Sequence, residues 1–470
     1  MMHRQVRFAF YDGLIAALDV LLVNAGFGAA FLLLWRHLAQ ASVNLSAYRH
    51  TILAISLTVP IVFHLLGLYE GWLRRSLRHV MYSVVVAIVV TCISTMALGF
   101  WSRQFAFPRS VIVLAAGVQI VMVSLFRFFA RRLYRRRLGN RRTVVVGESR
   151  ESAMAIARKF EQHSHGLYLV DRCFAISELK PPYEGLGSHE TVVLTEKLDN
   201  KDDLVLHCFR QNKELLIVPS ISELTVYGAE VLQVDDLLVF GIQPHRLEPA
   251  EEILKRSIDL MGAAALLLVT SPVLVAVAIA IHLTSEGPIL FRQERVGKDR
   301  RVFHLLKFRT MVHDAERYSG PVLAVEGDPR ITGLGRFLRA TRLDEFPQLI
   351  NILSGDMSLV GPRPEREFFV NQHEATFPAY ELRHSVKPGA TGLAQVMGRY
   401  DTTVERKLHF DLLYIYNYSL VLDLKILMQT VMVVLQSERT AGINLKKPLP
   451  DRVSHVRKLD TLADLERAAE

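Results

Sequence analysis

The chain has 470 residues, a formal net charge of +9 and a mean hydropathy of +0.22. It is too long for one ordinary domain and too apolar for a purely soluble protein, so we expect a membrane protein with at least two further domains. Its cysteines, Cys92, Cys173 and Cys208, have no CxxC spacing and predict neither a disulfide framework nor a zinc site. Much of the positive charge lies beside apolar segments, as in RRLYRRR at 131–137, which favours a cytoplasmic membrane face over nucleic acid as a partner.

Four apolar stretches predict an α-helical membrane bundle over residues 1–138. They lie at 13–35, 51–69, 80–101 and 110–130. Each is long enough to cross a hydrocarbon core of about 30 Å at about 1.5 Å per residue. Arginines are concentrated before the first stretch, between the second and third, and after the fourth. Both ends of the bundle should therefore face the cytoplasm.

Polar residues occur near or within the first predicted span, at Asp12, Asp19 and Asn24. Ionisable residues inside a membrane suggest a functional site. Because we find no neighbouring intramembrane base, we expect these residues to serve helix packing or the interface instead.

Residues 139–250 predict a soluble α/β domain. The segment TVVVGESRESAMAIARKF from Thr143 holds a β-branched run, a glycine and a helix-like stretch, and further apolar runs follow at 191–195 and 215–219. A dinucleotide-binding turn needs three glycines, and only Gly147 stands there. We therefore expect a degenerate, Rossmann-like domain that binds no nucleotide.

A fifth apolar segment, at 258–284, carries Ser271-Pro272 near its middle. Proline removes one helical hydrogen bond and kinks a helix. Basic residues flank both ends of the segment, whereas a spanning helix should show a charge bias to one side. We expect a re-entrant helix over 255–284 that returns to the cytoplasmic face. A fifth span with an external C-terminal domain is the alternative.

The remaining α/β region, to residue 440, has the composition of a polyanion-binding site, and a tail follows at 441–470. A hairpin is predicted over 286–311, with Lys307 and Arg309 alternating on its second strand. Later motifs combine glycine or proline with arginine, including Arg336 and Arg363, the latter between two prolines. Glycine permits close backbone approach and cations meet phosphate oxygens, so we expect these four residues to bind substrate. Contact with anionic lipid headgroups is the alternative.

An acidic pair, Asp344-Glu345, interrupts this basic region in RLDEFPQL. Pro347 suits the first turn of a helix that continues as QLINIL, so the pair should lie just before or at a helix start. Exposed N–H groups stabilise anions there. Taken alone, the pair could equally be a simple N-terminal acidic cap.

Several of these motifs carry a resemblance when they are taken in order. Between Lys255 and about Gln436, the chain resembles the catalytic domain of bacterial polyprenyl-phosphate hexose-1-phosphate transferases, the monotopic phosphoglycosyl transferases. The matching motifs are KRSIDL, GPILFRQERVG, KFRTM, LDEFPQLINILSGDMSLVGPRPE, KPGATGLAQVMGR and DLLYIYNYSLVLDLKIL. The predicted bundle and Rossmann-like domain are similar to the N-terminal half of the larger members.

The resemblance implies transfer of a hexose 1-phosphate from a UDP-sugar to undecaprenyl phosphate, giving undecaprenyl-diphospho-sugar and UMP. It implies the cytoplasmic face of a bacterial inner membrane, the initiation of exopolysaccharide, capsule or O-antigen synthesis, glucose or galactose as the sugar, and a homodimer. By the match, Asp344 is the nucleophile, with Mg²⁺ at its carboxylate, and Glu345 is an acid–base or positioning partner. Lys307 and Arg363 are implied phosphate contacts, and Asp411 matches a further acidic position of the family, which we group with the substrate-binding residues.

Two other functions share features with this sequence. Membrane nucleotide-sugar dehydratases and epimerases also join four spans to a Rossmann domain, but they need a Tyr-x-x-x-Lys pair, and no tyrosine here has a lysine four residues later. An inactive membrane scaffold or regulator of polysaccharide assembly is the non-enzymatic alternative. Transfer activity of an Asp344→Ala variant would discriminate it from the enzyme.

Overall fold

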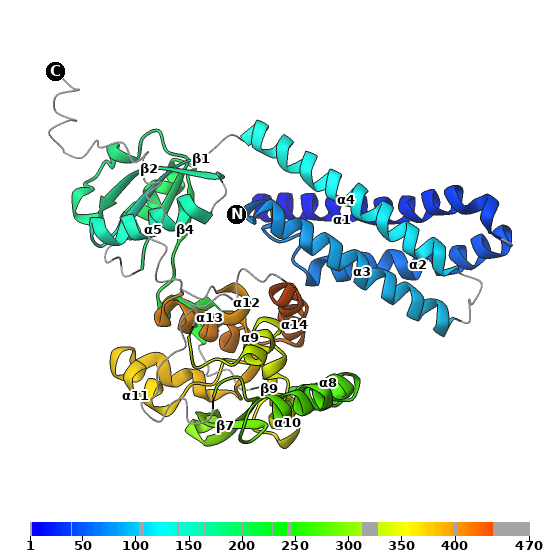
Figure 1. Ribbon diagram of the computed structural model, residues 1–470. Helices are drawn as coiled ribbons and strands as arrows, with labels where there is room; N and C mark the ends of the chain where they lie inside the picture. Colours follow the sequence, from blue (N-terminus) through cyan, green and yellow to red (C-terminus); the bar gives the residue numbers. More distant parts are fainter. Residues whose placement is uncertain are drawn as a thin grey trace. The chain divides into compact units, whose positions relative to one another are not determined.

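The computed structural model (Figure 1) describes most of the chain, which divides into two compact units between Val218 and Pro219. The described residues are 2–38, 40–102, 108–138, 141–163, 166–196, 198, 201–227, 229–234, 236–241, 247–312, 328–398 and 402–435. The predicted tail at 441–470 lies outside them. The positions of the units relative to one another are not determined, so each is treated by itself.

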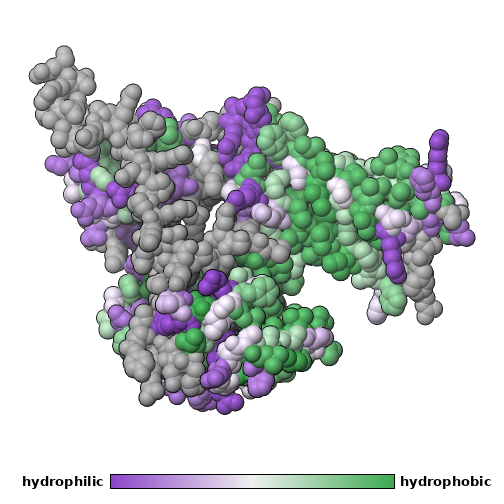
Figure 2. All heavy atoms as spheres, in the orientation of Figure 1, coloured by the Kyte–Doolittle hydropathy of each residue, from purple (hydrophilic) through white to green (hydrophobic). Residues whose placement is uncertain are grey.

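Long apolar helices form the first part of unit one. They are α1 (Met2–Leu34), α2 (Ala41–Leu65), α3 (Leu77–Trp101) and α4 (Arg109–Leu138). In Figure 2, hydrophobic residues cover the sides of this bundle. Each helix is long and apolar enough to cross a membrane, and so is α8 (Pro249–Thr284) of the second unit. Among the described residues, length and composition therefore give five candidate spans, and they do not decide between four spans and five.

A buried ion pair joins α1 to α4. Arg127 Nη2 donates to Asp19 Oδ2 at 2.5 Å, and the guanidinium lies 4.9 Å from the centre of the Trp72 ring. The expectation that Asp19 has no neighbouring intramembrane base was wrong, because α4 brings in a residue 108 positions later in the chain. Removing one partner would leave an uncompensated buried charge, so the pair constrains how the two helices pack.

A parallel sheet follows the bundle and confirms the predicted α/β region. Its strands, in the spatial order β2-β1-β3-β4, are β1 (Arg141–Gly147), β2 (Tyr168–Ala175), β3 (Thr191–Leu194) and β4 (Glu214–Ile217). Helices α5 (Arg150–His163) and α6 (Asp202–Arg210) connect strands in the βαβ manner. The sheet ends at Ile217, and the antiparallel hairpin of β5 (Glu230–Val234) and β6 (Leu237–Gly241) belongs to the second unit with α7 (Ile221–Tyr227).

The second unit builds its core from short elements around α8. The predicted hairpin forms from β7 (Leu290–Val296) and β8 (Val302–Phe308), with Leu290 opposite Phe308. The other elements are α9 (Gly333–Thr341), α10 (Gln348–Ser354), β9 (Ser358–Val360), α11 (Glu367–Thr376), β10 (Gly389–Thr391), α12 (Leu393–Met397), α13 (Val404–Tyr416) and α14 (Leu420–Leu435). Strands β9 and β10 pair in parallel, and residues of α10, α12, α13 and α14 share one hydrophobic core.

Both ends of α8 are attached to this unit. Near its start, Arg256 donates to the carbonyls of Ile352 and Leu353 at the end of α10, at 2.6 and 3.0 Å. Near its end, Ile281 packs in a cluster with Phe308 and other residues. The helix stays continuous through its proline.

A local hydrogen bond compensates for the proline in α8. Without an N–H, Pro272 leaves the carbonyl of Leu268, four residues earlier, without its helical donor. The Ser271 hydroxyl donates to that carbonyl at 2.8 Å. The Ser-Pro pair is thus accommodated inside the helix, and the bend predicted from it stays a prediction.

Candidate active site

The acidic pair lies in the turn between α9 and α10. Asp344 and Glu345 belong to a short 3-10 helix, η6 (Leu343–Glu345), and Pro347 directly precedes α10, as predicted from RLDEFPQL. Arg342, which begins this turn, has φ 60°, a left-handed conformation that non-glycine residues rarely adopt. Strained backbone of this kind is retained where the surrounding structure requires the geometry, and it is frequent at functional sites.

Three cations surround Glu345. Lys307 Nζ, from β8, lies 3.1 Å from Glu345 Oε1, and Arg363 Nη2 donates to the same oxygen at 2.5 Å. Arg342 Nη1 lies 3.8 Å from Glu345 Oε2. The structure therefore brings together Lys307, Arg363 and Glu345, three residues that sequence reasoning had placed in the site from widely separated motifs.

Asp344 is in a different environment from its neighbour. Its side chain is buried, and its Oδ1 atom has no hydrogen-bond partner among the described residues. A buried carboxylate oxygen without a partner is unfavourable unless a ligand completes the site. Mg²⁺ prefers oxygen ligands and commonly takes one or two protein carboxylates together with substrate phosphate and water. Asp344 therefore fits the magnesium ion that the family resemblance implies.

The two carboxyl groups differ in their proton affinity. Burial raises the pKa of Asp344 to about 6, and the Glu345 carboxylate adds to the effect while Lys307 opposes it. Burial also disfavours the ionised form of Glu345, but Arg363 and Lys307 outweigh it and hold the pKa of Glu345 well below its usual range. The ionised form of Glu345 is thus favoured here, which supports a positioning role over an acid–base role.

Helix α9 contributes a cation that the sequence analysis did not single out. Arg339 donates through Nε to Thr310 Oγ1 at 2.8 Å. Its positive charge offsets part of the rise that burial causes in the pKa of Asp344. The close packing of α9 against Thr310 depends on Gly335, because a Cβ there would lie 2.0 Å from the carbonyl oxygen of Thr310. Arg336, the predicted residue of this helix, is exposed, and no contact among the described residues places it beside the acidic pair.

Two further predicted residues form other contacts. Arg309 is buried and donates through Nη2 to the carbonyl and hydroxyl of Ser285, at 2.8 and 2.7 Å, just after the end of α8. Asp411, on α13, is buried, and its Oδ2 lies 3.0 Å from Nη2 of Arg383. Neither residue has a described contact with Asp344 or Glu345.

Sequence reasoning missed Arg339, Arg342 and Arg383. Arg339 and Arg342 stand five and two residues before Asp344, so proximity to the acidic pair was an available signal. No sequence signal pointed to Arg383, because its contacts with Asp411 and the carbonyl of Arg363 join residues that are distant along the chain.

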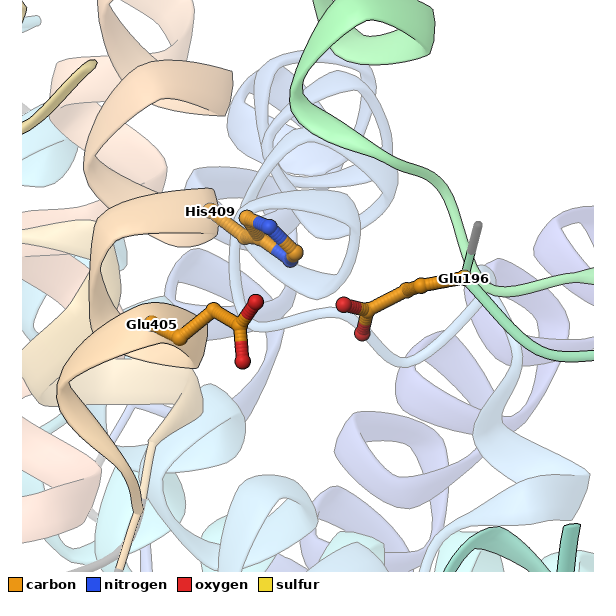
Figure 3. A group of neighbouring side chains, drawn as sticks. All are labelled: Glu196, Glu405 and His409. Carbon is orange, nitrogen blue, oxygen red and sulfur yellow. The ribbon is translucent and has the colours of Figure 1, made fainter. Parts of the chain in front are cut away.

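The second unit holds two further possible metal ligands. Glu405 and His409 lie one helical turn apart on α13 (Figure 3). Glu196, also labelled there, belongs to the first unit. Because the placement of the units relative to one another is not determined, we assign no common site to the three residues.

Comparison with protein families gives two matches. Residues 250–437 match the bacterial sugar transferase family, and residues 64–172 match a CoA-binding domain family. The first match contains the acidic pair and all the cations described around it. The second runs from the end of α2 to β2 and is remote from them in sequence.

Individual relatives match over a similar length. A UDP-N-acetylgalactosamine-undecaprenyl-phosphate N-acetylgalactosaminephosphotransferase of Aeromonas hydrophila is 42% identical over 192 residues, 40% of this chain and 45% of that protein. A UDP-glucose:undecaprenyl-phosphate glucose-1-phosphate transferase of Klebsiella pneumoniae is 37% identical over 250 residues, 49% of this chain and 54% of that protein. An exopolysaccharide production protein of Rhizobium leguminosarum is 41% identical over 198 residues, 40% of this chain and 97% of that protein. The chain thus spans about half the length of the Aeromonas and Klebsiella relatives and nearly all of the Rhizobium one.

Proposed function

Because this chain belongs to the bacterial sugar transferase family, we propose that it transfers a sugar 1-phosphate from a UDP-sugar to undecaprenyl phosphate, releasing UMP. The observation that carries the proposal is the acidic pair, in which Asp344 is buried with an oxygen that has no partner among the described residues, and Glu345 is held by Lys307 and Arg363. The two named transferases among the relatives support the same substrate classes.

The reaction we propose has two displacements at one phosphorus atom. A carboxylate oxygen of Asp344 attacks the phosphorus attached to the sugar, and the bond from that phosphorus to the bridging oxygen breaks, so the oxygen leaves with UMP. An oxygen of undecaprenyl phosphate then attacks the same phosphorus and releases the Asp344 carboxylate. Covalent catalysis of this kind divides one difficult transfer into two easier ones.

The cations supply the electrostatic part of the mechanism. Lys307 and Arg363 are fixed by Glu345, and each has further N–H groups with which to meet phosphate oxygens. Positioned cations stabilise a phosphoryl transition state without reorganising during the reaction. Magnesium bound at Asp344 would neutralise further charge on the phosphate oxygens.

We further propose that α8 is re-entrant and keeps the site at the cytoplasmic surface of the inner membrane. Attachment of both helix ends to the same unit supports this topology, as do the exposed apolar residues between them, such as Leu268 and Val269, each 76% exposed. A lipid phosphate at the membrane surface and a nucleotide donor in the cytoplasm would then meet at one site. The resemblance also implies a homodimer, which the mass of the detergent-solubilised protein tests.

The comparisons do not assign the sugar that this reaction transfers. The Aeromonas relative is named for N-acetylgalactosamine and the Klebsiella relative for glucose. We retain glucose or galactose 1-phosphate as the proposed group, for the initiation of exopolysaccharide, capsule or O-antigen synthesis.

Incubation of membranes with undecaprenyl phosphate and a panel of radiolabelled UDP-sugars tests the proposal. One donor should give a lipid-linked diphospho-sugar and an equal amount of UMP. The Asp344→Ala variant should form neither, and unchanged transfer by that variant would contradict the mechanism. If the unsubstituted chain forms no lipid product from any donor, the inactive scaffold becomes the better account.

A further inference from the structure

We infer that Arg383 and Asp411 are positioning residues that fix the backbone of Arg363, so that its guanidinium meets Glu345. The inference rests on the proposed function, because it gives these two residues a task in sugar-phosphate transfer. It also reassigns Asp411, which the sequence analysis had grouped with the substrate-binding residues.

The segment around Arg363 is held mainly through its carbonyl groups. Prolines on both sides of Arg363 have no N–H to donate, so this stretch depends largely on hydrogen bonds that its carbonyl groups accept. The carbonyl of Pro362 accepts from the Gly389 N–H at 2.9 Å, and that of Pro364 accepts from Arg295 Nη1 at 2.9 Å. The chain is thus anchored immediately before and after the functional arginine.

The carbonyl of Arg363 itself is bound by Arg383. The guanidinium donates through Nη2 to this oxygen at 2.8 Å and through Nη1 to the hydroxyl of Tyr380. Arg383 is buried, at 7% exposed, which excludes it from the solvent-facing cations that attract substrate. A planar, rigid guanidinium can hold several acceptors in fixed directions, which a lysine cannot reproduce.

Asp411 holds Arg383 in this orientation. Its Oδ2 atom lies 3.0 Å from the same Nη2 atom, and the two side chains are 4% and 6% exposed. A buried charge is costly unless paired, so each partner requires the other. The contacts therefore run from Asp411 through Arg383 to the backbone of Arg363, and from the Arg363 side chain to Glu345.

Hydrogen–deuterium exchange in the full-length chain, without substrate, tests this positioning. In Arg383→Lys, the amides of Gly361 and Gly389, which donate to the carbonyls of Thr391 and Pro362 at this segment, should exchange several-fold faster, while those of α10 stay unchanged. Arg300→Lys is the matched control, since Arg300 pairs with Glu374 on the surface, and it should exchange like the parent. If Arg383→Lys fails to fold, Asp411→Asn, which removes only the charge, should show the same local change. Unaltered exchange at Gly361 and Gly389 in the folded variant would overturn the inference.

A double-mutant cycle on sugar-phosphate transfer distinguishes positioning from a general structural role. Arg383→Lys should lower kcat about tenfold in the parent but have little effect in an Arg363→Ala background, because the residue it positions is already absent. Equal losses in both backgrounds would overturn the inference. If the parent transfers nothing, the proposed function fails, whereas the exchange result still decides whether Arg383 fixes the segment.

Discussion

Asp344 and Glu345 are adjacent, and their surroundings give them different tasks. Glu345 accepts from Lys307 and Arg363 and stays ionised, while Asp344 is buried and keeps an oxygen without a described partner. Environments that push the proton affinities of two carboxyl groups apart are a common sign of divided roles in catalysis. In our account, Asp344 reacts and Glu345 holds the cations.

Glu345→Gln should therefore lower kcat strongly. The neutral side chain keeps its size but leaves Lys307 and Arg363 without a fixed counter-charge, so their placement against the phosphate is lost. We expect a decrease of about two orders of magnitude, corresponding to about 3 kcal/mol. Glu374→Gln, which alters a carboxylate paired with Arg300, should keep parental turnover in the same assay. Parental kcat in Glu345→Gln would show that the cations need no such anchor.

His384 predicts a pH dependence of stability. Burial lowers its pKa from 6.5 to about 4, and the positive charges of Arg383 and Arg300 add to the effect. A carboxylate oxygen of Glu374 lies 3.9 Å from its Nε2 atom, and the backbone at Gly297 provides a hydrogen bond. Because the folded pKa lies below the unfolded one, stability is fully present above about pH 6.5 and is lost as the pH falls towards about 4.

Thermal unfolding of the detergent-solubilised chain tests this effect. Between pH 7 and pH 5 the Tm of His384→Gln should fall less than that of the parent, since the substituted side chain takes up no proton. His304→Gln, at an exposed histidine, is the matched control and should follow the parent. A parallel decline of the parent and His384→Gln would contradict the prediction.

At the scale of elements, α8 combines an apolar middle with anchored ends. Its Ser-Pro pair is accommodated by a local hydrogen bond, and Arg256 ties its start to α10. A helix that crossed the membrane once would separate its two ends by the bilayer thickness. Contact of both ends with one unit favours their return to one face.

Cysteine labelling tests the topology of α8. In a chain with Cys92, Cys173 and Cys208 replaced by alanine, Ala250→Cys lies in the first turn of the helix and Glu286→Cys lies just after its end. An impermeant maleimide should modify both only after intact cells are lysed. Ser102→Cys, at the end of α3 in a predicted external loop, should react in intact cells and serves as the control. Labelling of Glu286→Cys before lysis would instead indicate a fifth span.

Local patterns were sufficient to predict several elements. The hairpin at 286–311 and the helix after Pro347 depend on turn chemistry and alternation within a few residues, and both form. The cations around Glu345 were found from motif composition, although only the fold brings Lys307 and Arg363 to one oxygen atom.

Other contacts could not be predicted from the sequence. The Asp19–Arg127 pair depends on α1 packing against α4, and the Arg383 contact depends on which backbone oxygen it reaches. Such contacts join residues whose separation along the chain has no periodic signature. For the same reason, the exposed Arg336 could not be distinguished by sequence from Arg339, which lies one turn further along α9 and contacts Thr310.

At the scale of the whole molecule, the proposed chemistry resides in the second unit. The Rhizobium relative is covered to 97% by a match of 198 residues, a length close to that of residues 250–437. The second unit also has its own hydrophobic core. Domains with a separate core can generally fold alone.

A chain beginning at Pro219 should therefore retain sugar-phosphate transfer in membranes, within about tenfold of the full chain. The measurement is lipid product per amount of membrane-bound protein. Asp344→Ala in the same truncated chain is the control and should be inactive. Loss of all activity in a folded, membrane-bound truncated chain would show that the bundle or the parallel sheet takes part in the reaction.

The most direct measurement is to trap the phosphosugar on the protein. The full chain is incubated with a radiolabelled UDP-sugar donor in the absence of undecaprenyl phosphate, quenched, digested and analysed by mass spectrometry. Our account predicts a sugar-phosphate adduct on the peptide that contains Asp344, released UMP in equal amount, loss of the adduct when undecaprenyl phosphate is added, and none in Asp344→Asn. Transfer to undecaprenyl phosphate without any adduct, or an adduct that persists in Asp344→Asn, would contradict it.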